Sequence, residues 1–202
     1  MSNRVTLIGG APLAGKSYVA RKLAEEFNLP WISTDSIREQ MRQIVRKEDY
    51  PDLFHISDPS FTAEKFLTEN SAEEIVESQN KESFEVWKGV EAFIETDYVW
   101  GSFIVEGVAI LPNLAANLMN KNGNVRPVFL VDSDEKRIRE NVYTRGLWDD
   151  ADKYPDSVKD KEVEWVVAFS KWLEGECAKY SLPIVHVGDR KTYVEEVKKI
   201  GF

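Results

Sequence analysis

The sequence predicts an α/β protein of three layers, with helices on both faces of a five-stranded parallel sheet. Three observations predict this fold. Short apolar runs alternate along the chain with segments of helical periodicity, which is the pattern of a parallel sheet covered by helices. A glycine-rich turn directly follows the first apolar run. The length of 202 residues allows one well-buried domain and is short for two.

Five short apolar runs bounded by turn residues are expected to be strands. The first is almost continuously apolar, which is typical of a strand buried on both faces. Because crossovers between parallel strands have one hand, all five carboxyl ends should meet at one edge, where ligands bind. The expected strands are Arg4–Ile8, Trp31–Ser33, Phe103–Glu106, Pro127–Val131 and Ile184–Val187. The segments expected to converge at that edge are Gly9–Ser17, Ser33–Asp35, Glu106–Gly107, Asp132 and Gly188–Asp189.

Helices are expected where apolar residues recur at three- and four-residue spacing. Ser36 with Glu39, and Ser71 with Glu74, have the spacing of capping boxes, which predict where two helices begin. Thr192 is expected to cap the last helix. The expected helices are Lys16–Phe27, Ser36–Arg46, Ser71–Glu95, Leu111–Lys121, Asp134–Arg145, Val158–Tyr180 and a last one from Thr192. In the third of these, one apolar face is expected from Ile75, Val76, Phe84, Trp87, Val90 and Ile94.

Composition limits the classes of function. The net charge of −9 argues against wide contact with nucleic acid or anionic membrane, since both need a basic surface. No apolar stretch approaches the 18 residues of a membrane span, and no signal peptide is recognised, so we expect a cytoplasmic protein. The single cysteine, Cys177, excludes an internal disulfide and is expected in the core. The sequence leaves both a monomer and a homodimer open.

The most informative motif is GGAPLAGKS at residues 9–17. It matches G-x-x-x-x-G-K-[ST] between an expected strand and an expected helix, the context that phosphate binding requires. Glycines let backbone amides curl around a phosphate, Lys16 can reach it, and the Ser17 hydroxyl can hold Mg²⁺. The alternative is a glycine turn that merely ends a buried strand. The expected phosphate-binding residues are Gly10, Ala11, Pro12, Leu13, Ala14, Gly15, Lys16, Ser17 and Tyr18.

The chain resembles the small P-loop kinases, which include the adenylate, shikimate and gluconate kinases, and it is closest in motif to 2-phosphoglycerate kinase. The resemblance is carried by GGAPLAGKS, by ISTDSIREQMR from Ile32, and by IVEG at the end of the third expected strand. It covers residues 4–46 well and 102–146 more loosely. It implies a P-loop NTPase fold, ATP and Mg²⁺ as cofactors, and phosphoryl transfer to a small-molecule acceptor.

The same resemblance divides the chain by role. Residues 1–202 would form a single kinase domain, with a helical acceptor-binding insertion at 47–100 and an arginine-bearing lid at 145–157. Two features depart from the family pattern. Tyr18 stands where many of these kinases have a second serine or threonine, and the chain is shorter than 2-phosphoglycerate kinases that carry an extra N-terminal domain.

Polar residues at the expected strand ends are candidates for chemistry. In the kinases that the chain resembles, an aspartate at this position contacts the acceptor hydroxyl, which implies that Asp35 orients or deprotonates it, with helix capping as the alternative. Thr34 is expected to contact the acceptor beside it. The resemblance implies that Glu106 holds Mg²⁺ through water or contacts the acceptor, and a carboxylate that ends a buried strand is costly unless it has such a partner. Gly107 would let the acceptor approach the backbone closely.

Arginines supply candidate anion-binding groups. Arg38, Arg42 and Arg46 recur every four residues, so they share one helix face, which is either a solvated stripe or a wall that binds an anionic acceptor. Arg38 matches a substrate-binding arginine of the adenylate kinase pattern. Arg145, beside the expected lid, is the candidate for stabilising the transferring phosphoryl group. Arg139 is expected to stack on adenine, as its counterpart does in similar kinases.

Two histidines and a set of aromatic residues receive structural interpretations. His55 and His186 lack a serine or cysteine partner pattern and are expected to be structural. Trp165, Phe169 and Trp172 share helical spacing, which favours core packing over base stacking.

The leading hypothesis is therefore an ATP- and Mg²⁺-dependent small-molecule kinase, with a 2-phosphoglycerate-like acid as the first acceptor considered. A nucleoside monophosphate kinase and an antibiotic or sugar phosphotransferase are the alternatives within that class. A non-kinase nucleotide switch or slow ATPase is the alternative from another class.

Overall fold

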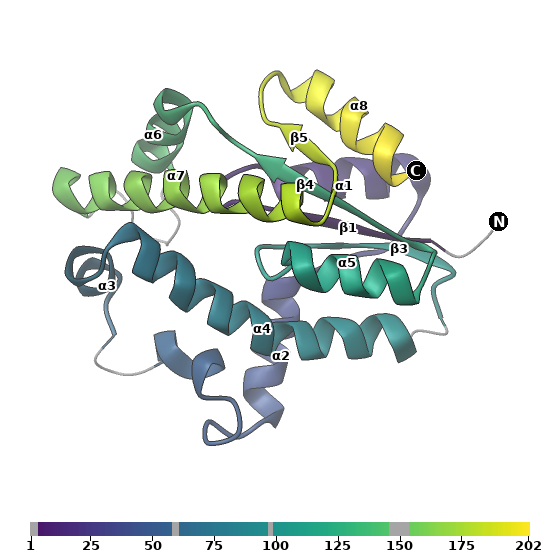
Figure 1. Ribbon diagram of the computed structural model, residues 1–202, viewed down its shortest axis with the longest axis horizontal. Helices are drawn as coiled ribbons and strands as arrows, with labels where there is room; N and C mark the ends of the chain where they lie inside the picture. The colour runs from purple at the N-terminus through teal and green to yellow at the C-terminus, as the bar shows by residue number, and fades with distance from the viewer. Residues whose placement is uncertain (1–3, 58–60, 97–98, 146–153) are drawn as a thin grey trace.

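A parallel sheet of five strands forms the centre of the molecule (Figure 1). The computed structural model describes residues 4–57, 61–96, 99–145 and 154–202. The strand order is β2-β3-β1-β4-β5, which confirms the predicted fold class. The strands are β1 Arg4–Gly10, β2 Trp31–Ser33, β3 Ser102–Glu106, β4 Val125–Val131 and β5 Ile184–His186.

Helices form a layer on each face of the sheet. Helices α1 and α8 pack together on one face, whereas α5 and α7 pack together against β4 on the other (Figure 1). Helix α4 lies outside this second layer, between α7 and α2. The helices are α1 Lys16–Phe27, α2 Thr34–Ile44, α3 Ala63–Glu69, α4 Ala72–Thr96, α5 Pro112–Lys121, α6 Glu135–Thr144, α7 Asp156–Lys179 and α8 Arg190–Gly201, with a 3-10 helix η1 at Pro51–Ser57.

The core lies between the sheet and these helices. In β1, Leu7 and Ile8 are fully buried on opposite faces of the strand, as the apolar run predicted. Phe129 on β4 and Phe169 on α7 are the largest fully buried side chains. Burying each such side chain contributes about 1.5–3 kcal/mol to the stability of this core, in which α7 packs against β4.

Two predicted helix caps are wrong, and a third is confirmed. Helix α2 begins at Thr34, because the Ser33 hydroxyl accepts a hydrogen bond from the Asp35 amide and takes the cap position expected of Ser36. In α8 the Asp189 carboxylate accepts from two amides and replaces Thr192 as the cap. The Ser71–Glu74 box before α4 is reciprocal, with N–O distances of 2.8 and 3.2 Å.

The expected apolar face of α4 is confirmed at five of its six residues, which are Ile75, Val76, Trp87, Val90 and Ile94. Phe84 is the exception, because it is 45% exposed, whereas Ser83 and Val86 are buried beside Trp87. The segment expected to be a loop at Tyr50–Ser60 contains η1, and residues 58–60 lie outside the described residues. Most of the loop expected at Leu147–Asp156 also lies outside them, and α7 begins at Asp156.

The sheet register brings the predicted segments to one edge. Ile8 on β1 and Ser33 on β2 are both paired with Glu106 on β3, so the loops after these three strands leave the sheet side by side. Asp132, after β4, lies at the same edge, where it forms an ion pair with Arg137. In the described parts of the chain, no helix has the length and apolar character needed to span a membrane.

Candidate active site

The phosphate loop presents an uncapped helix end. Gly15 occupies the cap position of α1 with φ of 85°, a left-handed conformation that favours glycine. Leu13 also has a positive φ, 61°, and such strain in a non-glycine residue is typical of functional loops. Among the described residues no side chain caps α1, and its first turn has no acidic residue. The first amides of α1 are therefore oriented toward an anion.

Lys16 is a buried cation beside this helix end. Its Nζ atom donates a 2.8 Å hydrogen bond to the carbonyl oxygen of Ala11, across the loop. Burial lowers the pKa of Lys16, while the carboxylates of Glu106 and Asp35 act in the opposite direction. The ammonium group is thus held at the site by a backbone carbonyl, a partner that a phosphate could replace, with two carboxylates nearby.

Ser17 and Glu106 form a pair suited to Mg²⁺. The Ser17 hydroxyl donates a 3.1 Å hydrogen bond to a carboxylate oxygen of Glu106, which is only 2% exposed. Burial raises the pKa of Glu106, and the nearby Lys16 and the Ser17 hydroxyl partly offset this. The described residues contain no cluster of three or more His, Cys, Asp or Glu that could bind a metal. A donor set that fits Mg²⁺ can nevertheless be formed from the Ser17 hydroxyl, the Glu106 carboxylate, nucleotide phosphates and waters.

Thr34 and Gly107 pack against each other at the floor of the site. Gly107 has φ of 151°, and a Cβ there would lie 1.8 Å from the Thr34 hydroxyl oxygen. The close approach that Gly107 was expected to permit for an acceptor is therefore made by Thr34. The Thr34 hydroxyl is buried and has no hydrogen-bond partner in the described structure. It is a polar group that remains available to a ligand.

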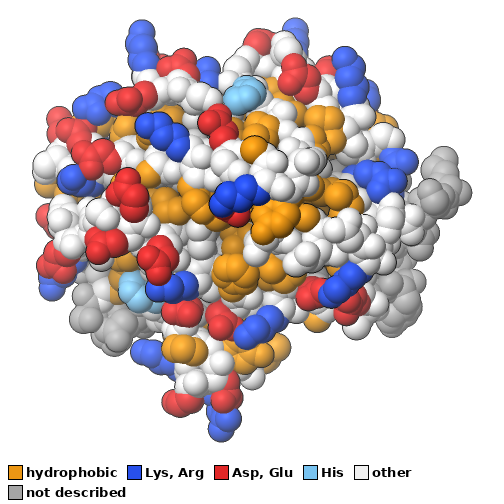
Figure 2. Space-filling model, viewed as in Figure 1, with side chains coloured by type: hydrophobic (Ala, Val, Ile, Leu, Met, Phe, Trp, Pro, Cys, Tyr) orange, Lys and Arg blue, Asp and Glu red, His pale blue; other side chains and the backbone are white. Residues whose placement is uncertain are grey.

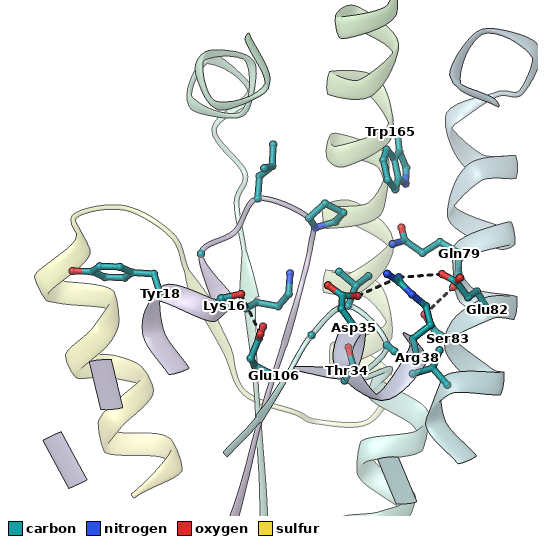
Figure 3. Close-up of a pocket in the computed structure, with 18 of the residues that line it drawn as sticks. Lys16, Tyr18, Thr34, Asp35, Arg38, Gln79, Glu82, Ser83, Glu106 and Trp165 are labelled. Carbon is teal, nitrogen blue, oxygen red and sulfur yellow. Dashed lines mark hydrogen bonds and ion pairs between the residues drawn. The ribbon is translucent and has the colours of Figure 1, made fainter. Parts of the chain in front are cut away.

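A cavity of about 740 Å³ connects the phosphate loop to the segment 47–100 (Figure 3). We call its two parts the loop end and the insertion end. The loop end is lined by the phosphate loop, α1, Glu106 and two arginines, Arg145 and Arg190. The insertion end is lined by side chains from α2, η1, α3, α4 and α7, which are Thr34, Asp35, Arg38, Asp52, His55, Phe66, Ser78, Gln79, Glu82, Ser83, Val86 and Trp165.

Charged side chains form a network at the insertion end. The Arg38 guanidinium lies 3.1 Å from Asp35 and 3.7 Å from Glu82 (Figure 3). Glu82 also pairs with Arg42 at 2.7 Å, which links α4 to α2. Burial raises the pKa of Glu82, and the two arginines act against this rise. Asp35 itself does not cap α2, because Ser33 does, so the Asp35 carboxylate extends toward the cavity.

The structure brings most of the predicted site residues to this cavity. Those that line it are Pro12, Leu13, Gly15, Lys16, Ser17, Tyr18, Thr34, Asp35, Arg38, Glu106, Gly107 and Arg145. Gly10, Ala11 and Ala14 contribute to the loop from buried positions behind the cavity lining.

Two predicted arginines lie elsewhere. Arg42 is outside the cavity lining and donates to the Leu53 carbonyl oxygen and to two carboxylates, so it fixes α2 to η1 and α4. Arg139 pairs with Asp160 at 2.6 Å and lies over the Tyr143 ring, on the α6–α7 surface. Neither side chain faces the cavity in this structure, since each has a closer partner on its own surface.

Sequence reasoning missed several lining residues. Trp165 is buried, as expected of a core residue, but it also lines the insertion end. His55, interpreted as structural, packs against Phe66 and lines the same end. Gln79 and Arg190 line the cavity but belong to no sequence motif. The Arg190 guanidinium carbon lies 4.9 Å from the centroid of the Tyr18 ring. Only tertiary packing brings these residues together, so spacing along the chain gave no signal for them.

Cys177 is a core residue, as predicted. Its side chain is fully buried, and burial raises the pKa of the thiol to about 12. A thiol with so high a pKa is not a nucleophile near neutral pH.

Comparisons with known proteins agree with the predicted resemblance. The chain is 33% identical to the 2-phosphoglycerate kinase of Methanocaldococcus jannaschii over 144 residues, which cover 70% of this chain and 46% of that protein. It is 29% identical to the 2-phosphoglycerate kinase of Methanothermobacter thermautotrophicus over 201 residues, which cover 96% and 64%. The chain thus spans less than two thirds of the length of these curated relatives. A scan against models of protein families gave no match.

Solved structures define the class of fold. A shikimate kinase from Bacteroides thetaiotaomicron matches with a TM-score of 0.56 at 15% identity, covering 97% of each chain. A gluconokinase from Sinorhizobium meliloti matches with a TM-score of 0.53 at 17% identity, covering 98% of this chain and 94% of the other. The fold is therefore that of the small P-loop kinases. Within that class, the curated relatives similar in sequence are 2-phosphoglycerate kinases.

Proposed function

We propose that the protein is a kinase that transfers the γ-phosphoryl group of ATP to a hydroxyl of a small molecule, with Mg²⁺ as cofactor. One observation carries the proposal. A single cavity joins an uncapped helix end, with Lys16 and Ser17, to a second region where Asp35 extends toward the same space. A nucleotide switch needs only the first of these, because it has no acceptor to bind.

The loop end would hold the donor. The amides at the start of α1 and the Lys16 ammonium would bind the β- and γ-phosphates. Ser17 would bind Mg²⁺ directly and Glu106 through water, and the ion, when bound, neutralises charge on the phosphates. Arg145 would stabilise the charge on the transferring group, since it lines the loop end at the base of the proposed lid.

The insertion end would hold the acceptor. Asp35 would accept the proton of the acceptor hydroxyl as its oxygen forms the new bond to phosphorus and the bond to ADP breaks. The Thr34 hydroxyl, which lines the cavity beside Gly107, would form a hydrogen bond with the acceptor. We propose residues 47–100 as the acceptor-binding insertion and 145–157 as the lid within one kinase domain, although 146–153 lie outside the described residues. We also propose a cytoplasmic location for the protein, in keeping with its single buried cysteine.

The names of the curated relatives make 2-phosphoglycerate the first acceptor to test. The assay follows ADP formation by the full chain with ATP, Mg²⁺ and a panel of small hydroxyl compounds. We expect an acceptor to raise the rate and Lys16→Met to abolish the reaction. Lys22→Met is the matched control, because Lys22 lies on the same helix in an exposed pair with Glu25. ADP formation that is equal with and without every acceptor would instead favour a slow ATPase.

A further inference from the structure

We propose that the insertion end binds an uncharged, hydroxyl-rich acceptor, such as a polyol or a sugar, and that Glu82 favours this preference by neutralising both Arg38 and Arg42. The inference rests on the proposed kinase function and concerns only the acceptor. The proposed acceptor differs from 2-phosphoglycerate, after which the curated relatives are named, because 2-phosphoglycerate carries about three negative charges near neutral pH.

The cations of the insertion end already have anionic partners. Arg38 contacts Asp35 at 3.1 Å, Glu39 at 3.0 Å and Glu82 at 3.7 Å. Arg42 is 7% exposed and bonded to Glu39, to Glu82 and to the Leu53 carbonyl oxygen. Three carboxylates thus surround two guanidinium groups, and Asp52 adds a further negative charge to the cavity wall. A multiply charged anion would have to compete with these carboxylates for the two guanidinium groups and would leave the largely buried Glu82 carboxylate without its partners, which is costly.

The other cations that line the cavity belong to the loop end. They are Lys16, Arg21, Arg145 and Arg190. Lys16 and Arg145 are occupied with the donor phosphates in the proposed reaction, and Arg190 lies over the Tyr18 ring. Outside the cavity, acidic side chains gather over α3 and the first turns of α4 (Figure 2). The surface over these two helices is therefore unfavourable for an anion as well.

The wall of the insertion end also presents uncharged hydrogen-bonding groups. The Thr34 hydroxyl is 1% exposed and has no partner within the described structure, and the side-chain oxygen of Gln79 is likewise buried and unpartnered there. Ser78 and Ser83 line the same wall. A hydroxyl group both donates and accepts, so a polyol can satisfy several of these groups at once. A buried polar group left unpaired costs about 1–3 kcal/mol, which makes such a wall selective for hydroxyls.

The indole of Trp165 completes this surface. It is 5% exposed and lines the insertion end near Gln79 (Figure 3). An aromatic ring beside hydrogen-bonding amides and hydroxyls suits a ligand with both C–H faces and hydroxyl edges. This description fits a polyol or sugar better than a small phosphorylated acid.

The first experiment compares acceptors in the wild-type chain. Initial rates of ADP formation are measured with ATP and Mg²⁺ against 2-phosphoglycerate, glycerate and a panel of uncharged polyols and sugars. We expect uncharged compounds to raise the rate and 2-phosphoglycerate to leave it at background. A kcat/KM for 2-phosphoglycerate above that of every uncharged compound would overturn the inference and leave the kinase function standing. A rate indifferent to every acceptor would overturn both.

The second experiment tests the role of Glu82. Glu82→Gln removes one negative charge from the cavity wall and a carboxylate partner of both Arg38 and Arg42, so the kcat/KM ratio of anionic to uncharged acceptors should rise about tenfold or more. Glu77→Gln is the matched control, because Glu77 lies on α4 in an exposed pair with Lys81 outside the cavity lining. Circular dichroism checks that each variant folds. An unchanged ratio in folded Glu82→Gln would overturn the assignment of Glu82.

A second variant keeps the inference testable if Glu82→Gln fails to fold. Gln79→Leu removes the unpartnered side-chain oxygen, and Gln79 takes part in none of the ion pairs described above. We expect the KM for the best uncharged acceptor to rise about tenfold, with kcat and the KM for ATP nearly unchanged. No change in KM for that acceptor would overturn the acceptor class.

Discussion

The loop end and the insertion end of the cavity are built in different ways. The loop end uses a contiguous segment, residues 9–17, whose backbone amides and one lysine surround the space where phosphates would bind. The insertion end has no contiguous segment, because its side chains come from α2, η1, α3, α4 and α7. The first is a motif in the chain, and the second exists only after folding.

The difference follows from the ligands that the two ends would take. A phosphate has the same shape and charge in every nucleotide, so a fixed backbone geometry can bind it and leaves a recognisable sequence. A small-molecule acceptor varies in shape and charge, so its binding surface is made of side chains placed by packing. Arg38 and Arg42 illustrate this, since two arginines on one helix face differ in whether they line the cavity.

Apart from the loss of Lys16, the largest effect is expected at the loop end. Arg145→Ala should lower kcat about 10³-fold with a smaller change in the KM for ATP, because the guanidinium acts on charge that develops during transfer. Steady-state kinetics with a working acceptor measure this. Arg139→Ala is the control, because Arg139 pairs with Asp160 outside the cavity and should lose little activity. Equal losses in both variants would contradict the placement of Arg145 as the arginine of the site.

A smaller effect is expected from the carboxylate that separates the two ends. Asp35→Asn should lower kcat about 10²-fold while ATP binding, measured by calorimetry, stays unchanged. The physical reason is that an amide cannot take the acceptor proton. Asp49→Asn is the control, because Asp49 forms an exposed pair with Arg46. Weakened ATP binding in Asp35→Asn, with transfer otherwise intact, would assign Asp35 to the loop end instead.

The smallest change in rate is expected from replacing Glu106, whose role is tested by the pH dependence of kcat/KM. Burial raises the pKa of Glu106, so its carboxylate takes up a proton at a higher pH than an ordinary glutamate does. As pH falls through this raised pKa, kcat/KM should decrease, because the protonated group no longer supports Mg²⁺. Glu106→Gln should lower kcat/KM about tenfold at neutral pH and remove this acid limb. A pH–rate profile with the same acid limb in both proteins would exclude Glu106 as its source.

Local sequence signals located the elements well and their ends less well. Helix α1 and strand β2 have the predicted bounds, because a glycine loop and a proline mark them. The start of α2 was misplaced, since Ser33 competed with Ser36 for the cap and only the backbone geometry of β2 decided between them. The spacing of Phe84 fits the buried face of α4, but α4 packs against α2 and α7 with Val86 buried and Phe84 at the exposed margin of that face.

The sequence by itself determined the fold class, the phosphate loop and the candidates at the strand ends. These depend on short-range periodicity and on the rule that parallel strands share one edge, so residues far apart in the chain could be placed together. Tertiary structure alone decided that Thr34 fills the space above Gly107, that Arg42 is held by Leu53, and that Gln79 and Trp165 line the cavity. The reason is that such contacts depend on how helices pack against one another, and that packing leaves no regular spacing in the sequence.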